Sequence, residues 1–281
     1  MAAFSIKTPP QHANWNDLLA IWRAADDMEV FESAWNFDHF YPLSPPEDGG
    51  CLEGGTTLAA LAQATKRIRV GTMVNGMHYR HPAVTANMAA SLDIISGGRF
   101  DLGLGAGWFE PESSAYGIPL GTMTQRMDRF DEGVEVIVRL LSQESTTFAG
   151  EYYQLTDAHC EPKGPQRPTP PIVIGGRGRK RTLRTVARWA DQWDALAPES
   201  PDAWLELNDV LLAHCVDVGR DPAEVRRSVH VFWALGDDPK EVAERAMTFG
   251  DVGVDAIIFS MRPPYDVARL EPLADALAAI G

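Results

Sequence analysis

Short apolar segments alternate with longer amphipathic segments along the chain. This order is typical of βα units, in which each strand of a parallel sheet is followed by a helix. The apolar runs predict strands at 4–8, 33–38, 68–74, 100–104, 172–174, 193–196, 229–234 and 254–260. Apolar residues at helical spacing predict helices at 15–28, 56–66, 82–95, 125–141, 180–189, 202–218, 239–249 and 265–280.

Strand–helix pairs in this order predict one closed α/β domain over residues 1–281, a (β/α)₈ or TIM barrel. A doubly wound open sheet is the alternative for the same order of elements. The fourth connection is the longest, because it adds a loop at 105–123 before its helix and a hairpin at 146–155 after it. The barrel therefore carries an insertion after strand 4. In such barrels the functional residues lie where the strands end, at the C-terminal face.

The second predicted strand ends in Trp35-Asn36-Phe37-Asp38-His39. Side chains alternate along a strand, so Trp35, Phe37 and His39 share one face, and Asn36 and Asp38 share the other. An aromatic ring, a carboxylate and an imidazole at a strand end suit a planar ligand and a proton transfer. The alternative is that Asp38 and His39 only bind loop backbone and hold the rim of the barrel together.

Glycines follow the fourth strand at Gly105-Ala106-Gly107. A Rossmann fingerprint would need a third glycine three residues further on and a helix that begins at once, and neither is present. We interpret the glycines as leaving a flat gap on which a ring or a chain can lie. The third strand, which ends near Gly76, is an ordinary buried strand with a bend.

The segment after the fifth strand combines glycines with cations. Gly175, Gly176 and Gly178 alternate with Arg177, Arg179, Lys180 and Arg181 just before a predicted helix. Exposed backbone N–H groups, a helix N-terminus and arginines together bind phosphate groups. A basic helix start without a ligand is the alternative, although cations are disfavoured at the positive end of the helix dipole. The sequence predicts a phosphate-binding loop here.

The overall charge excludes several classes of partner. A net charge of −14 and an isoelectric point near 4.9 would repel nucleic acid. The widely spaced Cys51, Cys160 and Cys215 are expected to be reduced thiols in a cytoplasmic protein. Residues 1–8 do not resemble a signal peptide, and no apolar run is long enough for a bilayer. His78 and His81 lack companions at metal-ligand spacing, so no metal site is expected.

Several motifs resemble the luciferase-like family, the bacterial luciferase superfamily, and within it the actinobacterial branch that uses coenzyme F420. The resemblance covers nearly the whole chain in order. Its motifs are Phe37-Asp38-His39-Phe40, Arg80-His81-Pro82-Ala83, Gly105 to Glu112 with Ala115 to Pro119, and Ile174-Gly175-Gly176 with Arg181-Thr182-Leu183.

The resemblance implies a TIM barrel with an insertion, a homodimer, and a deazaflavin lying across the strand ends. It places His39 beside the reacting carbon of the cofactor. It also implies a bulge in which Thr72, Met73 and Val74 support the ring, with a non-proline cis peptide at Met73–Val74. The loops Gly105-Ala106-Gly107 and Gly175-Gly176-Arg177-Gly178-Arg179 match segments that contact the cofactor's chain and phosphate.

Two positions depart from the F420-dependent sugar-phosphate dehydrogenases of this family. These enzymes carry a tryptophan where this chain has Leu43, and a glutamate where it has Trp108. The differences argue against a sugar-phosphate substrate and leave the proton donor open.

The sequence therefore predicts an oxidoreductase that transfers a hydride between coenzyme F420 and a small organic substrate. His39, steered by a carboxylate such as Asp38, would carry the proton. An FMN-dependent luciferase-like monooxygenase and a non-catalytic flavin or deazaflavin carrier are the alternatives. Neither the substrate nor the direction of hydride transfer follows from the sequence.

Overall fold

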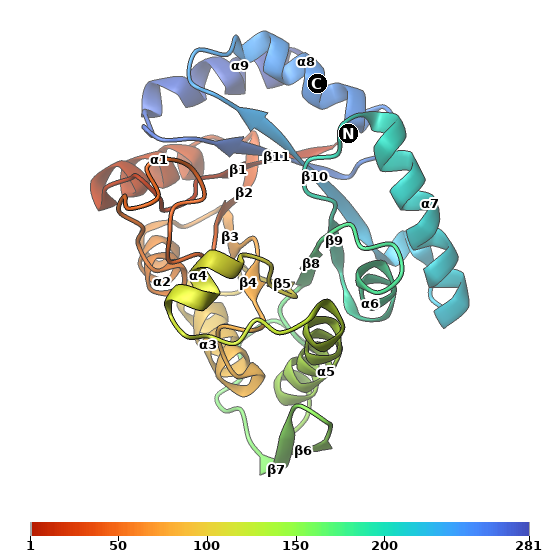
Figure 1. Cartoon of the computed structure of the whole chain (residues 1–281). Coiled ribbons are helices and arrows are strands. Elements are labelled where there is room, and N and C mark those ends of the chain that lie inside the picture. The colour runs from red at the N-terminus through yellow and green to blue at the C-terminus, as the bar shows by residue number, and fades with distance from the viewer. Residues whose placement is uncertain (1, 281) are drawn as a thin grey trace.

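The alternating strands close into a parallel barrel, as Figure 1 shows for the computed structural model, which describes residues 2–280. Each strand pairs with the next around the ring, and β11 pairs with β1, so the barrel has no open edge. The barrel strands are, in ring order, β1 (Ala3–Lys7), β2 (Phe31–Asn36), β3 (Arg69–Thr72), β5 (Phe100–Gly105), β8 (Ile172–Gly175), β9 (Gln192–Asp194), β10 (Arg226–Trp233) and β11 (Ala256–Met261). The closed ring confirms the TIM barrel and excludes the open-sheet alternative.

Helices surround the barrel on the outside (Figure 1). Most of them lie within two or three residues of their predicted positions, and α6 begins at Thr182 rather than at Lys180. The surrounding helices are α1 (Trp15–Asp27), α2 (Gly54–Ala64), α3 (Pro82–Ser96), α5 (Met123–Ser142), α6 (Thr182–Trp189), α7 (Pro201–Val218), α8 (Pro239–Gly250) and α9 (Leu270–Ile280), with 3-10 turns η1 (Pro222–Glu224) and η2 (Val267–Arg269). No helix among residues 2–280 is both long and apolar enough to cross a membrane.

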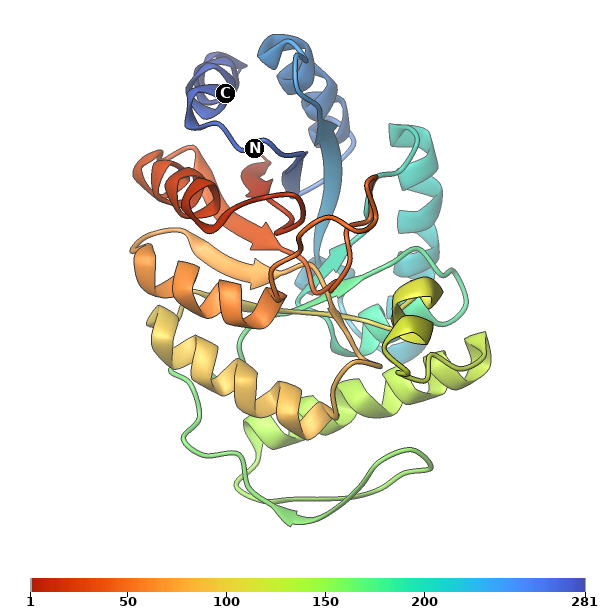
Figure 2. The same ribbon diagram turned by 60° about the vertical axis from the view of Figure 1, so that its left-hand side comes forward.

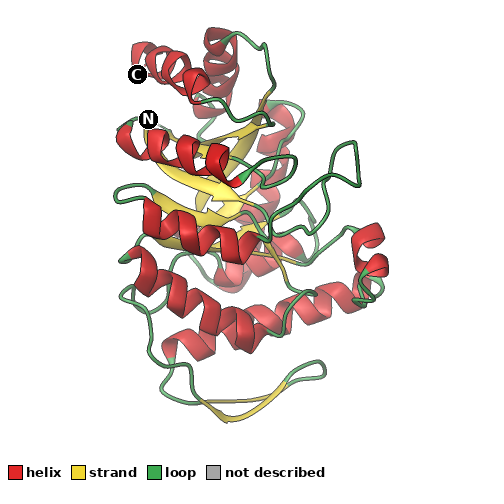
Figure 3. Ribbon diagram, turned by 90° about the vertical axis from the view of Figure 1, so that its left-hand side faces the viewer, coloured by secondary structure: helices red, strands yellow, loops and turns green. Residues whose placement is uncertain are grey.

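The insertion after β5 is present as the sequence predicts. It consists of α4 (Glu110–Ala115), the long helix α5 and a hairpin of β6 (Thr146–Ala149) and β7 (Gln154–Ala158), which projects from the barrel in Figure 2. Helix α5 begins at Met123 because its N-cap residue Thr122 forms a reciprocal capping box with Gln125. Figure 3 shows α4 on the same side of the molecule as the long loops that follow the strands.

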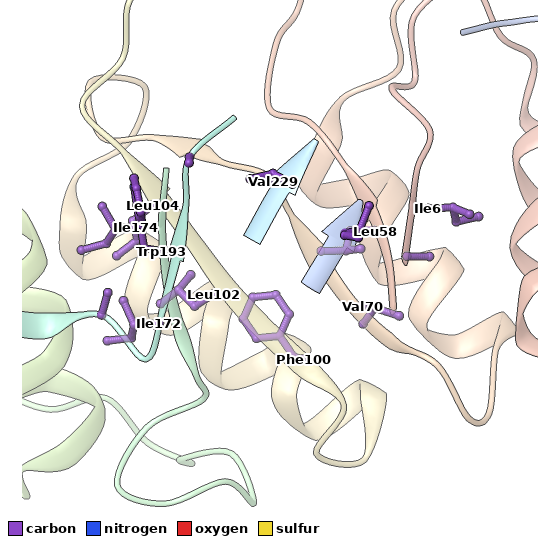
Figure 4. Packing of buried hydrophobic residues seen from close by; sticks show 14 of the residues in the cluster. Ile6, Leu58, Val70, Phe100, Leu102, Leu104, Ile172, Ile174, Trp193 and Val229 are labelled. Atoms are coloured by element: carbon purple, nitrogen blue, oxygen red, sulfur yellow. The ribbon is translucent and has the colours of Figure 1, made fainter. Parts of the chain in front are cut away.

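Two hydrophobic layers hold the barrel together. The outer layer lies between strands and helices, and Figure 4 shows Leu102 and Leu104 of β5 there beside Ile174 and Trp193. A smaller inner cluster of Trp35, Met73, Val173 and Ile258 fills the barrel interior. Both layers follow from strand alternation, since neighbouring residues point to opposite faces. Each large apolar side chain buried in this way contributes about 1.5–3 kcal/mol.

Ion pairs close the N-terminal mouth of the barrel. Arg69, at the start of β3, donates to both carboxylate oxygens of Asp101, at 3.0 Å from Nε to Oδ2. Arg226, at the start of β10, binds Glu32 of β2 through two hydrogen bonds, one of them 2.9 Å. Both pairs lie at the beginnings of the strands, so the open end of the barrel is at the other side, where the strands end.

Candidate active site

A cavity of about 660 Å³ lies at the C-terminal ends of the strands. Residues in or just after most of the barrel strands line it, including Lys7 at the end of β1, Val74 after β3, Gly175 of β8 and Ser260 of β11. His39, Trp108 and Arg177 come from the loops that follow three of the strands. The volume is in the range of sites for cofactors and small molecules.

Val74 fills a socket made by glycines of the two neighbouring strands. The peptide bond Met73–Val74 is cis, as the family resemblance implies. A Cβ atom added to Gly105 would lie 2.6 Å from Cγ2 of Val74, and one added to Gly175 would lie 3.1 Å from Cγ1. These glycines therefore make room for Val74, which lines the cavity, and the gap predicted for a ring or chain is partly taken by this side chain.

Buried hydrogen bonds fix the segment that carries Val74. Thr72 Oγ1 donates to Asn36 Oδ1 at 2.9 Å, and the Met73 N–H donates to the Asn36 carbonyl at 3.0 Å. Asn36 in turn donates from Nδ2 to the carbonyl of Gly54. Met73 and Val74 border the cavity, whereas Thr72 lies behind them and is fully buried. Of the three residues predicted to support a ring, Met73 and Val74 thus line the cavity, and Thr72 holds their segment in place from behind.

His39 lies at the edge of the cavity and is held through one ring nitrogen. Its Nδ1 is 2.8 Å from Oε2 of Glu112, and its ring packs edge-on against Phe37 and Trp108. Only 15% of the side chain is exposed. Nε2 makes no hydrogen bond to any of the described residues 2–280, so it is the nitrogen left for a ligand in the cavity.

Glu112 connects helix α4 with the segment after β2. The carboxylate is completely buried, and it accepts from the backbone N–H groups of Phe40 and Tyr41 and from the Tyr79 hydroxyl as well as facing His39. Burial alone would raise the pKa of Glu112, but the hydrogen bonds from His39, Tyr79 and Phe40 outweigh it and hold this pKa below its usual value. The carboxylate is therefore charged at neutral pH.

Asp38 borders the cavity but is bound on the side away from His39. Arg80 donates to both of its oxygens, at 2.6 and 2.8 Å, and the Gly76 N–H donates at 3.1 Å. Arg80 also binds Glu53 at 2.7 Å. Burial raises the pKa of Asp38, and the pairing with Arg80 only partly offsets this effect. The carboxylate that steers His39 in this structure is Glu112, rather than Asp38 as predicted.

The predicted phosphate-binding loop lies beside the cavity, but its cations diverge. Arg177 lines the cavity and pairs with Glu199 at 3.2 Å, while Arg179 reaches Glu206 on α7 at 2.9 Å. Arg181 turns to Asp128 and Asp131 on α5, at 2.8 and 2.6 Å.

Arg181 therefore ties two helices together and is not part of the four-cation cluster that the sequence suggests. Gly176 has a positive φ of 136°, and its N–H donates to the Asp194 carbonyl. Of the glycine loops, Gly105, Gly107, Gly175 and Gly176 border the cavity, whereas Ala106 packs against the outer core and Gly178 lies against Thr182.

Comparison with known proteins decides the family. The sequence model described as "Luciferase-like monooxygenase" matches residues 2–279. The chain belongs to the luciferase-like family. Its fold agrees with this assignment, since the structure titled "F420-dependent secondary alcohol dehydrogenase in complex with an F420-acetone adduct" superposes over 100% of both chains with a TM-score of 0.88 at 18% identity. At that identity the superposition shows the luciferase-like fold alone.

Two curated relatives carry names of F420-dependent dehydrogenases. This luciferase-like chain is 33% identical over 223 residues to "F420-dependent hydroxymycolic acid dehydrogenase" of Mycobacterium tuberculosis. The aligned part covers 79% of this chain and 60% of the relative. The chain is 29% identical over 256 residues to "F420-dependent glucose-6-phosphate dehydrogenase" of Kineococcus radiotolerans. This alignment covers 90% of the chain and 74% of the relative. The matched part is thus less than two thirds of the mycobacterial protein.

Two contacts of this luciferase-like site were not anticipated from the residues. Glu112 stands in the motif that carries the family resemblance, yet nothing in its spacing marks it as the partner of His39. Lys7 ends the first strand, and only the structure places its side chain on the cavity. A charged residue at the end of an otherwise apolar barrel strand is the signal that could have singled out Lys7.

Proposed function

We propose that the protein transfers a hydride between coenzyme F420 and a small organic molecule bound in this cavity. One observation carries the proposal: His39, oriented by the buried Glu112, borders the cavity from the segment after β2, while Val74 in its glycine socket forms another part of the wall. A proton-transferring imidazole next to a rigid apolar surface suits a reaction in which a planar cofactor exchanges a hydride and the substrate exchanges a proton.

The residues present fit a planar ring with an anionic chain. Met73 and Val74, backed by Thr72, would support the ring, and the loop Gly105-Ala106-Gly107 would lie along the chain. The loop Gly175–Arg179 would bind the phosphate through Arg177, with Arg179 and the N–H groups of the loop beside it. Gly107 has a positive φ of 82°, and a side chain there would collide with the His78 ring. The path of this loop beside His78 therefore depends on glycine.

When bound, F420 would supply a carbon centre that accepts or donates a hydride and reacts poorly with oxygen. The chain's own residues do the remaining work. Nε2 of His39 would take a proton from an alcohol, or give one to an enone or imine, while the Glu112 carboxylate holds Nδ1 and stabilises the imidazolium form. Asp38 would act mainly through Arg80 and Gly76 by fixing the loop beside His39. The rings of Phe37 and Trp108 pack edge-on against the imidazole.

Binding measurements separate F420 from FMN. We expect purified apo-protein titrated with each cofactor, followed by ring fluorescence, to bind F420 at least about tenfold more tightly than FMN. A preference for FMN, together with oxygen consumption by the reduced complex, would favour the luciferase-like monooxygenase alternative.

A panel of substrates separates an enzyme from a carrier. Oxidation of reduced F420 would be followed against enones, imines and nitro compounds, and reduction of oxidised F420 against alcohols. Turnover with at least one class is expected. Tight F420 binding without turnover of any class would instead indicate a carrier.

The resemblance also implies a homodimer, and one surface suits it. A groove between α2 and α3 is lined by apolar and small residues, and Val84 and Ile95 on α3 are exposed to 50% and 42%. We propose that a second copy of the chain covers this groove. Light scattering should show a dimer that Val84→Glu converts to a monomer, while Val216→Glu on the exposed face of α7 leaves it intact. A monomeric parent protein would contradict this assignment.

A further inference from the structure

The wall of the cavity opposite the glycine loops has a different chemistry. In the ring order, β1 lies across the barrel from β8, which carries Gly175. Lys7 of β1 stands in register with Ser260 of β11, and Ser260 stands in register with Phe232 of β10. These three side chains therefore form one level of the barrel interior, and all of them line the cavity.

Lys7 brings an ammonium group to this wall without a partner. It makes no hydrogen bond and no ion pair with any residue in the described range 2–280. The side chain keeps some accessible surface because it borders the cavity, although protein surrounds it closely. Burial lowers the pKa of Lys7 to about 8, and the charge of Asp194 only partly offsets this effect. A cation held in such a position gains free energy from an anion.

Neither of the two acids discussed for this wall forms an ion pair with Lys7, although Oδ2 of Asp194 has no hydrogen-bond partner within residues 2–280. Asp194 is fully buried, accepts from Ser228 at 3.1 Å, and lies 3.2 Å from Nε2 of His230. Burial lowers the pKa of His230, so this imidazole is neutral at neutral pH. Asp38, the acid of the cavity rim, is bound by Arg80. Asp194 acts on Lys7 only through its charge, and no carboxylate of residues 2–280 forms an ion pair with the ammonium. A carboxylate in direct contact with Lys7 would therefore have to come from a ligand.

We propose that the wall formed by Lys7, Ser260 and Phe232 binds a carboxylate of the substrate. The Lys7 ammonium and the Ser260 hydroxyl, which makes no hydrogen bond within residues 2–280, would donate to it, and Phe232 would contact the apolar part. The single ammonium of Lys7 matches the single charge of a carboxylate. A phosphate dianion would call for a second cation beside Lys7, and Arg262 of this wall is instead exposed at the rim of the cavity. That the ligand is the substrate rests on the proposed function.

The site can be tested with small probes and without turnover. Benzoate and its neutral analogue benzamide would be titrated by calorimetry into the purified protein, with and without F420. We expect benzoate to bind at least about tenfold more tightly than benzamide at neutral pH. Lys7→Met should abolish this preference, Lys7→Arg should retain part of it, and Lys66→Met, which changes an exposed lysine, should leave it unchanged.

The pH dependence identifies the group that binds the probe. The affinity for benzoate should fall as the pH rises through about 8, and it should do so only while Lys7 is present. Lys7→Met is the necessary comparison, because other charged or titratable groups face the same cavity: Asp38, His39, His78, Tyr79, Arg177, His230 and Arg262, with Asp194 behind them.

Several outcomes would overturn the proposal. These are equal affinities for benzoate and benzamide, no detectable benzoate binding at about 10 mM, or an unchanged preference in Lys7→Met. Preferential binding of inorganic phosphate over benzoate would replace the carboxylate by a phosphate. Weaker F420 binding by Lys7→Met, with the benzoate preference intact, would make Lys7 a cofactor contact.

A second measurement does not depend on the folding of the variant. The chain has five lysines, Lys7, Lys66, Lys163, Lys180 and Lys240, so side-chain labelling gives a simple NMR spectrum. One signal should titrate near pH 8 and shift when benzoate is added. If no signal does so, the proposal fails. A benzoate preference in a protein that does not bind F420 would leave the carboxylate site standing and remove the proposed function.

Discussion

Nδ1 of His39 lies 2.8 Å from Oε2 of Glu112, a residue 73 positions later in the chain. His39 follows β2, and Glu112 belongs to α4, the first helix of the insertion. Because the same carboxylate also binds backbone N–H groups beside His39, the insertion fixes both the orientation of the imidazole and the path of the loop that carries it. The insertion is therefore part of the candidate active site.

Glu112→Gln should destabilise the protein at neutral pH. Loss of the charged, buried acceptor should lower the free energy of unfolding by about 2–3 kcal/mol. The pKa of Glu112 is lowered in the folded state, so its stabilising effect is present above the ordinary value of 4.5 and is lost as the pH falls through the lowered value. Urea denaturation should show a difference that shrinks on acidification, and exposed Glu110→Gln is the control.

His39→Gln should separate chemistry from cofactor binding. If Nε2 carries the substrate proton, kcat should fall by about 100-fold or more. The Kd for F420 should stay within about threefold, because the side chain is proposed to contact the reacting centre rather than the phosphate. Stopped-flow kinetics and fluorescence titration give the two values. Unchanged turnover would remove His39 from the mechanism, and His159→Gln beside the distant β6–β7 hairpin serves as the matched control.

The barrel and its insertion could be predicted because they depend on local periodicity. Met127, Phe130 and Val134 recur at helical spacing and are all buried in α5. The strand ends could likewise be located, and they do meet at one cavity. The cis peptide at Met73–Val74 came from the family resemblance and is present, although no pattern of residue types in this segment indicates it.

The pairing of charged groups could not be predicted, because it depends on how distant elements pack. Arg181 stands among four cations in the sequence, but the packing of α6 beside α5 brings it to Asp128 and Asp131. Asp38 is adjacent to His39 in the chain, yet strand alternation and the loop after β4 (Asn75–Gly76) direct it to Arg80. Proximity in sequence therefore identified the residues of the site but not their partners.

The Asp38–Arg80 pair should be a coupled structural unit. Asp38→Asn would leave Arg80 half-buried with only Glu53 as an acidic partner, so we expect a loss of about 3 kcal/mol in unfolding free energy. Arg80→Gln should cost a similar amount, and the double variant should cost clearly less than the sum of both. A double-mutant cycle by chemical denaturation measures this coupling, expected at about 1–3 kcal/mol. Additive effects would show that the two residues act independently.

Gly105→Ala should disturb the surface proposed to support the ring. The new Cβ would lie 2.6 Å from Cγ2 of Val74, so this side chain has to move, and the cavity wall moves with it. We expect the affinity for F420 to fall by about tenfold. Fluorescence titration measures the change, and Gly50→Ala is the control because a Cβ there meets no atom within 4 Å. An unaltered affinity would show that Val74 does not support the cofactor.

Arg177 and Arg181 should differ in their effect on cofactor binding, although they are four residues apart in one basic segment. Arg177 borders the cavity and pairs with the exposed Glu199, whereas Arg181 is held by two aspartates of α5. Arg177→Gln should weaken F420 binding by about tenfold and leave the affinity for the same deazaflavin without its phosphate unchanged. Arg181→Gln should lower the melting temperature with little effect on either affinity. Titrations of both variants with both ligands decide the matter: an equal loss for the two ligands in Arg177→Gln would mean that this guanidinium does not bind the phosphate.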